Sequence, residues 1–187
     1  MIKAYILFGG IFMSKRITVI NIIVTSLLGT LLHFAYDFFG QNYVIGLFSA
    51  VNESIWEHQK LLFFPTFFVS IIQFVFCRDC RKCFWISRLF GVLFGMLIII
   101  SLYYTVTGII GKNIDAFNIA LFYIGVISTF VLSNIFQKNR VLCGRYSNII
   151  GFSIFIALSI LFVLFTNNPP SIALFQDPQA IKNATGN

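Results

Sequence analysis

Long apolar runs alternate with short polar breaks along almost the whole chain. A helix needs roughly 20 residues to cross the hydrocarbon core of a bilayer. Five runs are close to that length: Ile17–Phe39, Lys60–Cys77, Phe84–Ile110, Ile114–Phe136 and Asn148–Thr166. An isolated strand cannot satisfy its backbone hydrogen bonds in lipid, so helix is expected for each run. The pattern predicts an all-α integral membrane bundle, a single domain over residues 1–187 with about five transmembrane helices.

Two further apolar segments are too short to span. Met1–Phe12 is expected to be an interfacial stub or the first part of an entry helix. It does not look like a cleaved signal, because no small-residue cleavage site follows the next run. Val44–Val51 is expected to lie in the interface or to form a re-entrant segment.

Composition makes the lipid bilayer the main partner of this chain. Hydrophobic residues account for 58% of it, charged residues for 10%, and 24 residues are phenylalanine. That is more apolar surface than a soluble domain of this size can bury. The net charge of +7 does not indicate nucleic acid as a partner, because the basic residues form short clusters between the apolar runs.

These basic clusters predict the orientation in the membrane. Ten of the 13 basic residues fall on one side of the predicted spans: Lys3, Lys15, Arg16, Arg78, Arg81, Lys82, Arg88, Lys138, Arg140 and Arg145. Cytoplasmic loops carry the excess of Lys and Arg. We therefore expect a multi-pass plasma-membrane protein with a cytoplasmic N-terminus, an outer loop over Gly40–Gln59, and an extracytoplasmic tail over residues 167–187.

The ionisable groups of the outer side gather in one window. Both histidines and both glutamates of the chain lie between residues 33 and 58. Charge near hydrocarbon is costly, so such a cluster predicts a functional site. Ser26, Thr30, His33 and Asp37 follow the spacing of one helical face. Asp37 is placed to contact His33 and to fix its tautomer.

The second half of the window contains Glu53, Glu57, His58 and Lys60. On a continuous helix the two glutamates share one face with Lys60, whereas His58 points about 100° away from Glu57. A purely structural interpretation is also open. Ser54 and Glu57 match a capping box, Lys60 pairs with Glu57, and His33 and Asp37 serve in buried hydrogen bonds to other helices.

Three functions fit this window. In the first, His33, Asp37, Glu53, Glu57 and His58 provide the ligands of a divalent metal such as zinc, and the protein is a membrane hydrolase acting on a lipid-like substrate. In the second, a metal-free carboxylate–histidine pair moves protons or binds cations in a small transporter. In the third, the cluster only joins helices in a non-catalytic scaffold subunit. The spacing of a helical HExxH zinc site is absent from the sequence.

Four cysteines, Cys77, Cys80, Cys83 and Cys143, all fall on the predicted cytoplasmic side. Thiols stay reduced there. A structural metal site and reversible palmitoylation are both open for them. At the other side, Asn167–Pro178 is an extended, proline-bounded segment. We expect its Leu174 and Phe175 to fold back onto the outer mouth of the bundle and to bring Asp177 towards the window.

The segment Phe48–Pro65, which reads FSAVNESIWEHQKLLFFP, resembles a motif of a family of uncharacterised multi-pass membrane proteins from Gram-positive bacteria, grouped as a domain of unknown function. Leu32–Asp37 and Pro169–Pro178 resemble the other two landmarks of that family. Gln179–Asn187 departs from the glycine-rich continuation that the family carries. The resemblance implies a bacterial plasma membrane and no particular activity.

Overall fold

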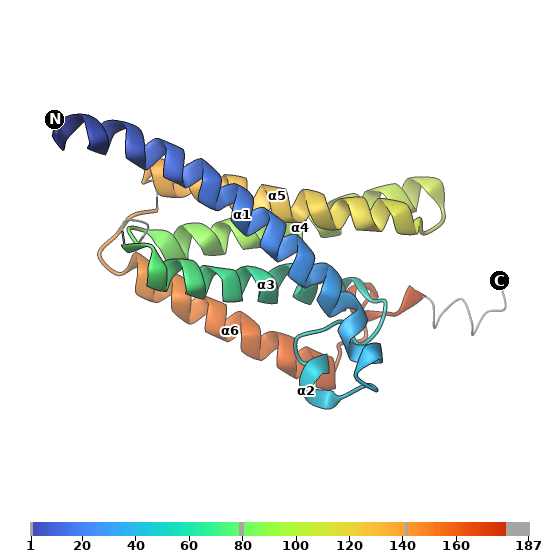
Figure 1. Cartoon of the computed structure of the whole chain (residues 1–187). Coiled ribbons are helices and arrows are strands. Elements are labelled where there is room, and N and C mark those ends of the chain that lie inside the picture. Colours follow the sequence, from blue (N-terminus) through green and yellow to red (C-terminus); the bar gives the residue numbers. More distant parts are fainter. Residues whose placement is uncertain (1, 79–80, 141, 179–187) are drawn as a thin grey trace.

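The computed structural model describes residues 2–78, 81–140 and 142–178, with side chains from residue 15 onward. These residues form the helices α1 (Ile2–Phe38), α2 (Tyr43–Gly46), α3 (Ile55–Phe76), α4 (Phe84–Ile110), α5 (Asp115–Asn139) and α6 (Ser147–Asn167), followed by the short 3-10 helix η2 (Ala173–Phe175) (Figure 1). The prediction of an all-α membrane bundle is confirmed.

Five of these helices are long and apolar enough to cross a membrane, and they match the predicted spans within a few residues. The largest difference is at α3, which begins at Ile55 and not at Lys60 because Ser54 caps it. The N-terminal segment is part of an entry helix, since α1 continues without a break from Ile2 into the first span.

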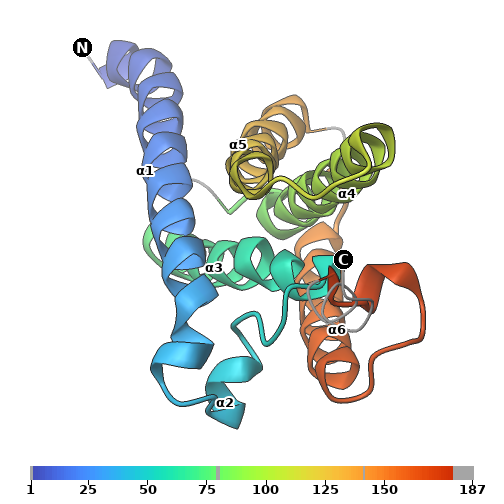
Figure 2. The same cartoon turned by 90° about the vertical axis from the view of Figure 1, so that its right-hand side faces the viewer.

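α3 is the central helix of the bundle. It lies between α1 and α6, while α4 and α5 pack against each other on one side (Figure 2). Small residues let α4 and α5 approach closely, as is usual between membrane helices. A Cβ added at Gly95 in α4 would lie 2.7 Å from the carbonyl oxygen of Gly125 in α5.

An aromatic core fills the middle of the bundle. Phe63 of α3 and Phe155 and Phe162 of α6 have no exposed surface. Phe67 stacks on Phe155 with ring centroids 5.2 Å apart and ring planes 9° apart, and Trp85 of α4 packs edge-on against the same ring at 5.6 Å. These rings join α3, α4 and α6.

The two ends differ in chemistry. One, called here the basic end, contains Lys15, Arg78 and the α5–α6 loop with Arg145. The other, called the histidine end, contains the C-terminus of α1, α2 and the N-terminus of α3. The chain runs from one end to the other five times, so the predicted separation of basic clusters from the polar window holds.

The cysteines differ from the prediction of reduced thiols. Cys83 at the start of α4 and Cys143 in the α5–α6 loop form a disulfide, with Cα atoms 5.2 Å apart. None of the three described cysteines is a free thiol. The prediction rested on the compartment alone, whereas the fold brings these two segments together at the basic end. The described residues do not include Cys80 or residues 179–187, where the sequence departs from the glycine-rich continuation of the family.

Candidate functional site

The loop between α1 and α3 folds back over the end of α1. Gly40 and Gln41 turn the chain with φ values of 65° and 59°, and Asn42 then caps α2 by accepting the Val44 amide at 2.9 Å. The Ser49 hydroxyl donates to the carbonyl of Leu32 in α1. These contacts hold the segment beside the last turns of α1.

Ser54 decides how the chain enters α3. Its backbone is extended, with φ −69° and ψ 151°, and its hydroxyl accepts the Glu57 amide at 3.3 Å. The capping half of the predicted capping box is therefore present. The Ser54 amide itself donates to Asn52 at 2.9 Å. Glu53 thus precedes the helix, and the predicted shared helical face of Glu53 and Glu57 does not exist.

Three side chains from separate segments meet at the histidine end. They are His33 of α1, Glu53 of the loop and His58 of α3, and one possible ligand atom from each lies within 4.8 Å of the others. His58 Nε2 is 3.4 Å from Glu53 Oε2, and these side chains are 29% and 43% exposed. The two imidazole rings lie 5.2 Å apart, centroid to centroid. The cluster is therefore assembled and open on one side.

Hydrogen bonding orients the His58 ring. Its Nδ1 lies 3.0 Å from the carbonyl oxygen of Ser54, and a carbonyl oxygen can only accept. Nδ1 therefore carries the proton, and in the neutral ring Nε2 has its lone pair facing Glu53. His33 Nδ1 is buried and has no hydrogen-bond partner in the described part of the chain. A buried nitrogen without a partner is costly.

Glu57 lies apart from this cluster in a buried ion pair. Its Oε2 is 2.6 Å from Lys60 Nζ, and the two side chains are 3% and 0% exposed. Lys60 also donates to the carbonyls of Gly46 at 2.8 Å and Ser49 at 3.1 Å, which uses all three ammonium hydrogens.

Both carboxylate oxygens of Glu57 also accept a further hydrogen bond. They accept the Val51 amide at 3.0 Å and the hydroxyl of Thr166 in α6 at 3.1 Å. The pair fastens the loop and α6 to α3, which makes Glu57 a structural residue. Sequence reasoning missed Thr166, whose position in the last turn of an apolar helix that ends at the histidine end was the available indication.

Asp37 is exposed and is not a member of the cluster. No hydrogen bond or ion pair of its carboxylate is present among the described residues. The structure therefore brings together His33, Glu53 and His58 from the predicted set, and leaves Asp37 and Glu57 outside.

The tail covers part of the same end of the bundle. Trp56 lies between Phe162 of α6 and Phe175 of η2, with ring centroids 4.6 and 4.9 Å away. Leu174 packs against the buried cluster that includes Ile55. Leu174 and Phe175 therefore fold back onto the histidine end of the bundle, as predicted.

A family model described as a family of unknown function, DUF6512, matches residues 10–184. The chain belongs to this family. The DUF6512 match includes all five long helices except the first residues of α1, together with the whole His33–Glu53–His58 cluster. No curated protein and no solved structure matches the chain.

Proposed function

We propose that this DUF6512 member is a membrane metalloprotein. In this proposal His33, Glu53 and His58 bind a divalent cation of the zinc type, and the centre hydrolyses a lipid-like substrate that reaches it from the bilayer. The observation that carries the proposal is the meeting of three possible ligand atoms from three separate segments within 4.8 Å.

The donor set suits zinc. Two histidines and one glutamate form a known catalytic zinc set, in which the fourth position is left for water. Donors at 2.0–2.1 Å from a tetrahedral ion lie about 3.3–3.4 Å apart. His58 Nε2 and Glu53 Oε2 already have this spacing, at 3.4 Å. His33 completes the set after a small movement of its ring, and the exposed side of Glu53 leaves room for a substrate.

A bound zinc ion would make hydroxide available at neutral pH by acidifying its water ligand. Glu53 would offset part of the charge of the ion. The Ser54 carbonyl holds the His58 ring in the tautomer that offers Nε2. Asp37, exposed one turn beyond His33, is the carboxylate available to exchange protons with the site.

The competing transport function is supported less well. A cation that crossed the bundle from this cluster would have to pass the aromatic core, where Phe63, Phe155 and Phe162 have no exposed surface. It would also pass the Glu57–Lys60 pair, whose hydrogen-bonding groups are occupied. This arrangement favours a site that works at one face of the membrane.

The charge asymmetry supports an orientation as well. Ten of the 13 basic residues lie at the basic end or precede it in the chain. The positive-inside rule therefore favours a cytoplasmic basic end and a cluster on the extracytoplasmic side of the plasma membrane. The resemblance in sequence implies the plasma membrane of a Gram-positive bacterium. The substrate would then be a lipid or lipid-linked molecule of the outer leaflet.

Metal analysis of the purified full-length protein tests the proposal. After zinc loading and desalting we expect about one zinc per chain, its loss in His33→Ala and His58→Ala, and its retention in the matched control Asp37→Asn. Chelator-sensitive cleavage of ester or phosphodiester lipids would establish the hydrolase. Bound zinc without any turnover would favour the cation-binding alternative. Equal metal content in the His58→Ala variant and the wild type would overturn the metal site.

A further inference from the structure

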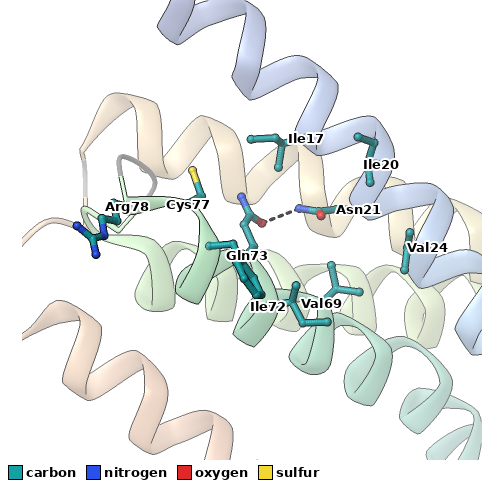
Figure 3. Close-up of a pocket in the computed structure, with 10 residues that line it drawn as sticks. Ile17, Ile20, Asn21, Val24, Val69, Ile72, Gln73, Cys77 and Arg78 are labelled. Atoms are coloured by element: carbon teal, nitrogen blue, oxygen red, sulfur yellow. Dashed lines mark hydrogen bonds between the residues drawn. The ribbon is translucent and has the colours of Figure 1, made fainter.

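A groove lies between α1 and α3 at the basic end, far from the histidine cluster. It has a volume of about 640 Å³, within the range of roughly 300–1,000 Å³ for small-molecule sites. Figure 3 shows aliphatic side chains of α1 and α3 on its two sides, among them Ile20, Val24 and Ile72. Arg78 lies at the end of the groove where α3 stops.

The groove has the length of one leaflet. Its lining runs from residue 17 to residue 24 of α1 and from residue 69 to residue 78 at the end of α3. At 1.5 Å per residue this is about 10–14 Å, less than half of the roughly 30 Å hydrocarbon core. Ile20 and Ile72 are 57% and 59% exposed, so the walls face lipid. An acyl chain can therefore enter from the side.

The polar part of the groove leads to a buried arginine. Asn21 Nδ2 donates to Gln73 Oε1 at 2.6 Å, and Arg88 Nη2 donates to the same oxygen at 2.8 Å. Arg88 is 2% exposed and lies over the Phe130 ring at 4.4 Å.

The charge of Arg88 is not compensated locally. Its Nε and Nη1 have no hydrogen-bond partner within the described residues, and no described carboxylate forms an ion pair with it. A positive charge in apolar surroundings is weakly screened. Positive charge therefore lies at two places near the groove: Arg88 behind the Gln73 side chain, and Arg78 at the end of the groove.

From this amphipathic and positively charged groove we infer a binding site for an anionic phospholipid. One acyl chain lies between α1 and α3, and the phosphate of the headgroup meets Arg78 at the rim. The lipid belongs to the leaflet at the basic end. The site shares no residue with the proposed metal centre, so neither proposal depends on the other.

Lipid retention by the full-length protein tests the site. We expect native mass spectrometry of the protein with phosphatidylglycerol and phosphatidylcholine to show preferential retention of the anionic lipid. Filling the groove by Ile20→Trp should remove the bound lipid, while the control Ile23→Trp, on an equally exposed part of α1 outside the groove, should keep it. Arg78→Gln should reduce the anionic preference about fivefold, and Arg145→Gln, at the same end but outside the groove, should not.

Three results on lipid retention would overturn the inference. They are equal retention of the two lipids by the wild type, unchanged retention in Ile20→Trp, and equal losses in a test variant and its control. Displacement of the lipid by inorganic phosphate alone would also contradict it, because it would indicate a site for a free anion. Thermal unfolding of each variant identifies those that fail to fold.

Discussion

The carboxylate of Glu53 and the imidazole of His58 lie 3.4 Å apart although the N-cap of α3 separates them in the chain. Ser54 makes this contact possible. Its extended backbone turns Glu53 back along the new helix, its hydroxyl caps the Glu57 amide, and its carbonyl oxygen lies 3.0 Å from His58 Nδ1. Ser54 is therefore a positioning residue for both members of the pair.

Replacing Ser54 by alanine should weaken the site more than the fold. Loss of an N-cap costs about 1 kcal/mol, and an ill-defined entry into α3 frees Glu53 from His58. We expect a modest fall in the unfolding temperature and a loss of about tenfold or more in zinc affinity, measured by calorimetric titration. Asn42→Ala removes the cap of α2 in the same loop and serves as the control. Equal zinc affinity in the wild type and Ser54→Ala would contradict the role of Ser54.

Glu57→Gln tests the buried ion pair. The change leaves the Lys60 ammonium in a site with no exposed surface and without its carboxylate. Removing one partner of a buried pair costs about 3–5 kcal/mol, which should be visible as a large drop in the thermal unfolding temperature. Glu53→Gln, in a partly exposed pair, should cost about 1 kcal/mol or less.

The double variant of Glu57→Met with Lys60→Met separates the charge effect from packing. Replacing both charges by apolar groups should recover part of the lost stability, because neither charge is then left buried alone. An unchanged unfolding temperature in Glu57→Gln would show that this pair does not fasten the loop to α3.

α1 crosses α3 at Gly29, so a change at this position should affect both the packing of the two helices and the position of His33. A Cβ at this position would lie 2.5 Å from the carbonyl oxygen of Leu61 and 2.5 Å from Cζ of Phe122. Gly29→Ala must push α1 outward, and His33 lies one turn further along the same helix. We expect reduced zinc affinity together with lower stability. The control is Gly108→Ala, where a Cβ meets nothing within 4 Å, and it should leave zinc affinity and stability unchanged. Equal changes of zinc affinity in the two variants would refute the link between Gly29 and the site.

The spans and the position of the polar window are predictable because they are local properties of the sequence. A run of about 20 apolar residues predicts a membrane helix wherever it occurs. The pairing inside the window is different. A shared face for Glu53 and Lys60 requires one continuous helix, whereas α3 begins only after Ser54. One extended residue changed the direction of the Glu53 side chain. On α3, His58 and Glu57 point in different directions, and for this reason His58 reaches the cluster whereas Glu57 does not.

The contacts between distant segments could not be read from the sequence at all. The partners of Lys60 include the carbonyls of Gly46 and Ser49, and any residue type provides a carbonyl. The same holds for the Asn21–Gln73–Arg88 network, because it depends on where α1 crosses α3. A single polar residue near the end of a span is common in sequence, and only the packing of the helices brings these three together at the basic end.

Thiol labelling decides the orientation, on which the disulfide and the charge pattern disagree. The positive-inside rule places the basic end in the cytoplasm, whereas disulfides such as Cys83–Cys143 persist mainly in oxidising compartments. We expect the charge pattern to decide, because it directs membrane insertion, and the Cys83–Cys143 disulfide would then lie at the cytoplasmic face. In variants with one cysteine each, a membrane-impermeant maleimide should reach Cys143 only after permeabilisation. A cysteine placed by Ser171→Cys near η2 should react in intact cells. The reverse result would put the His33–Glu53–His58 cluster in the cytoplasm and its substrate in the inner leaflet.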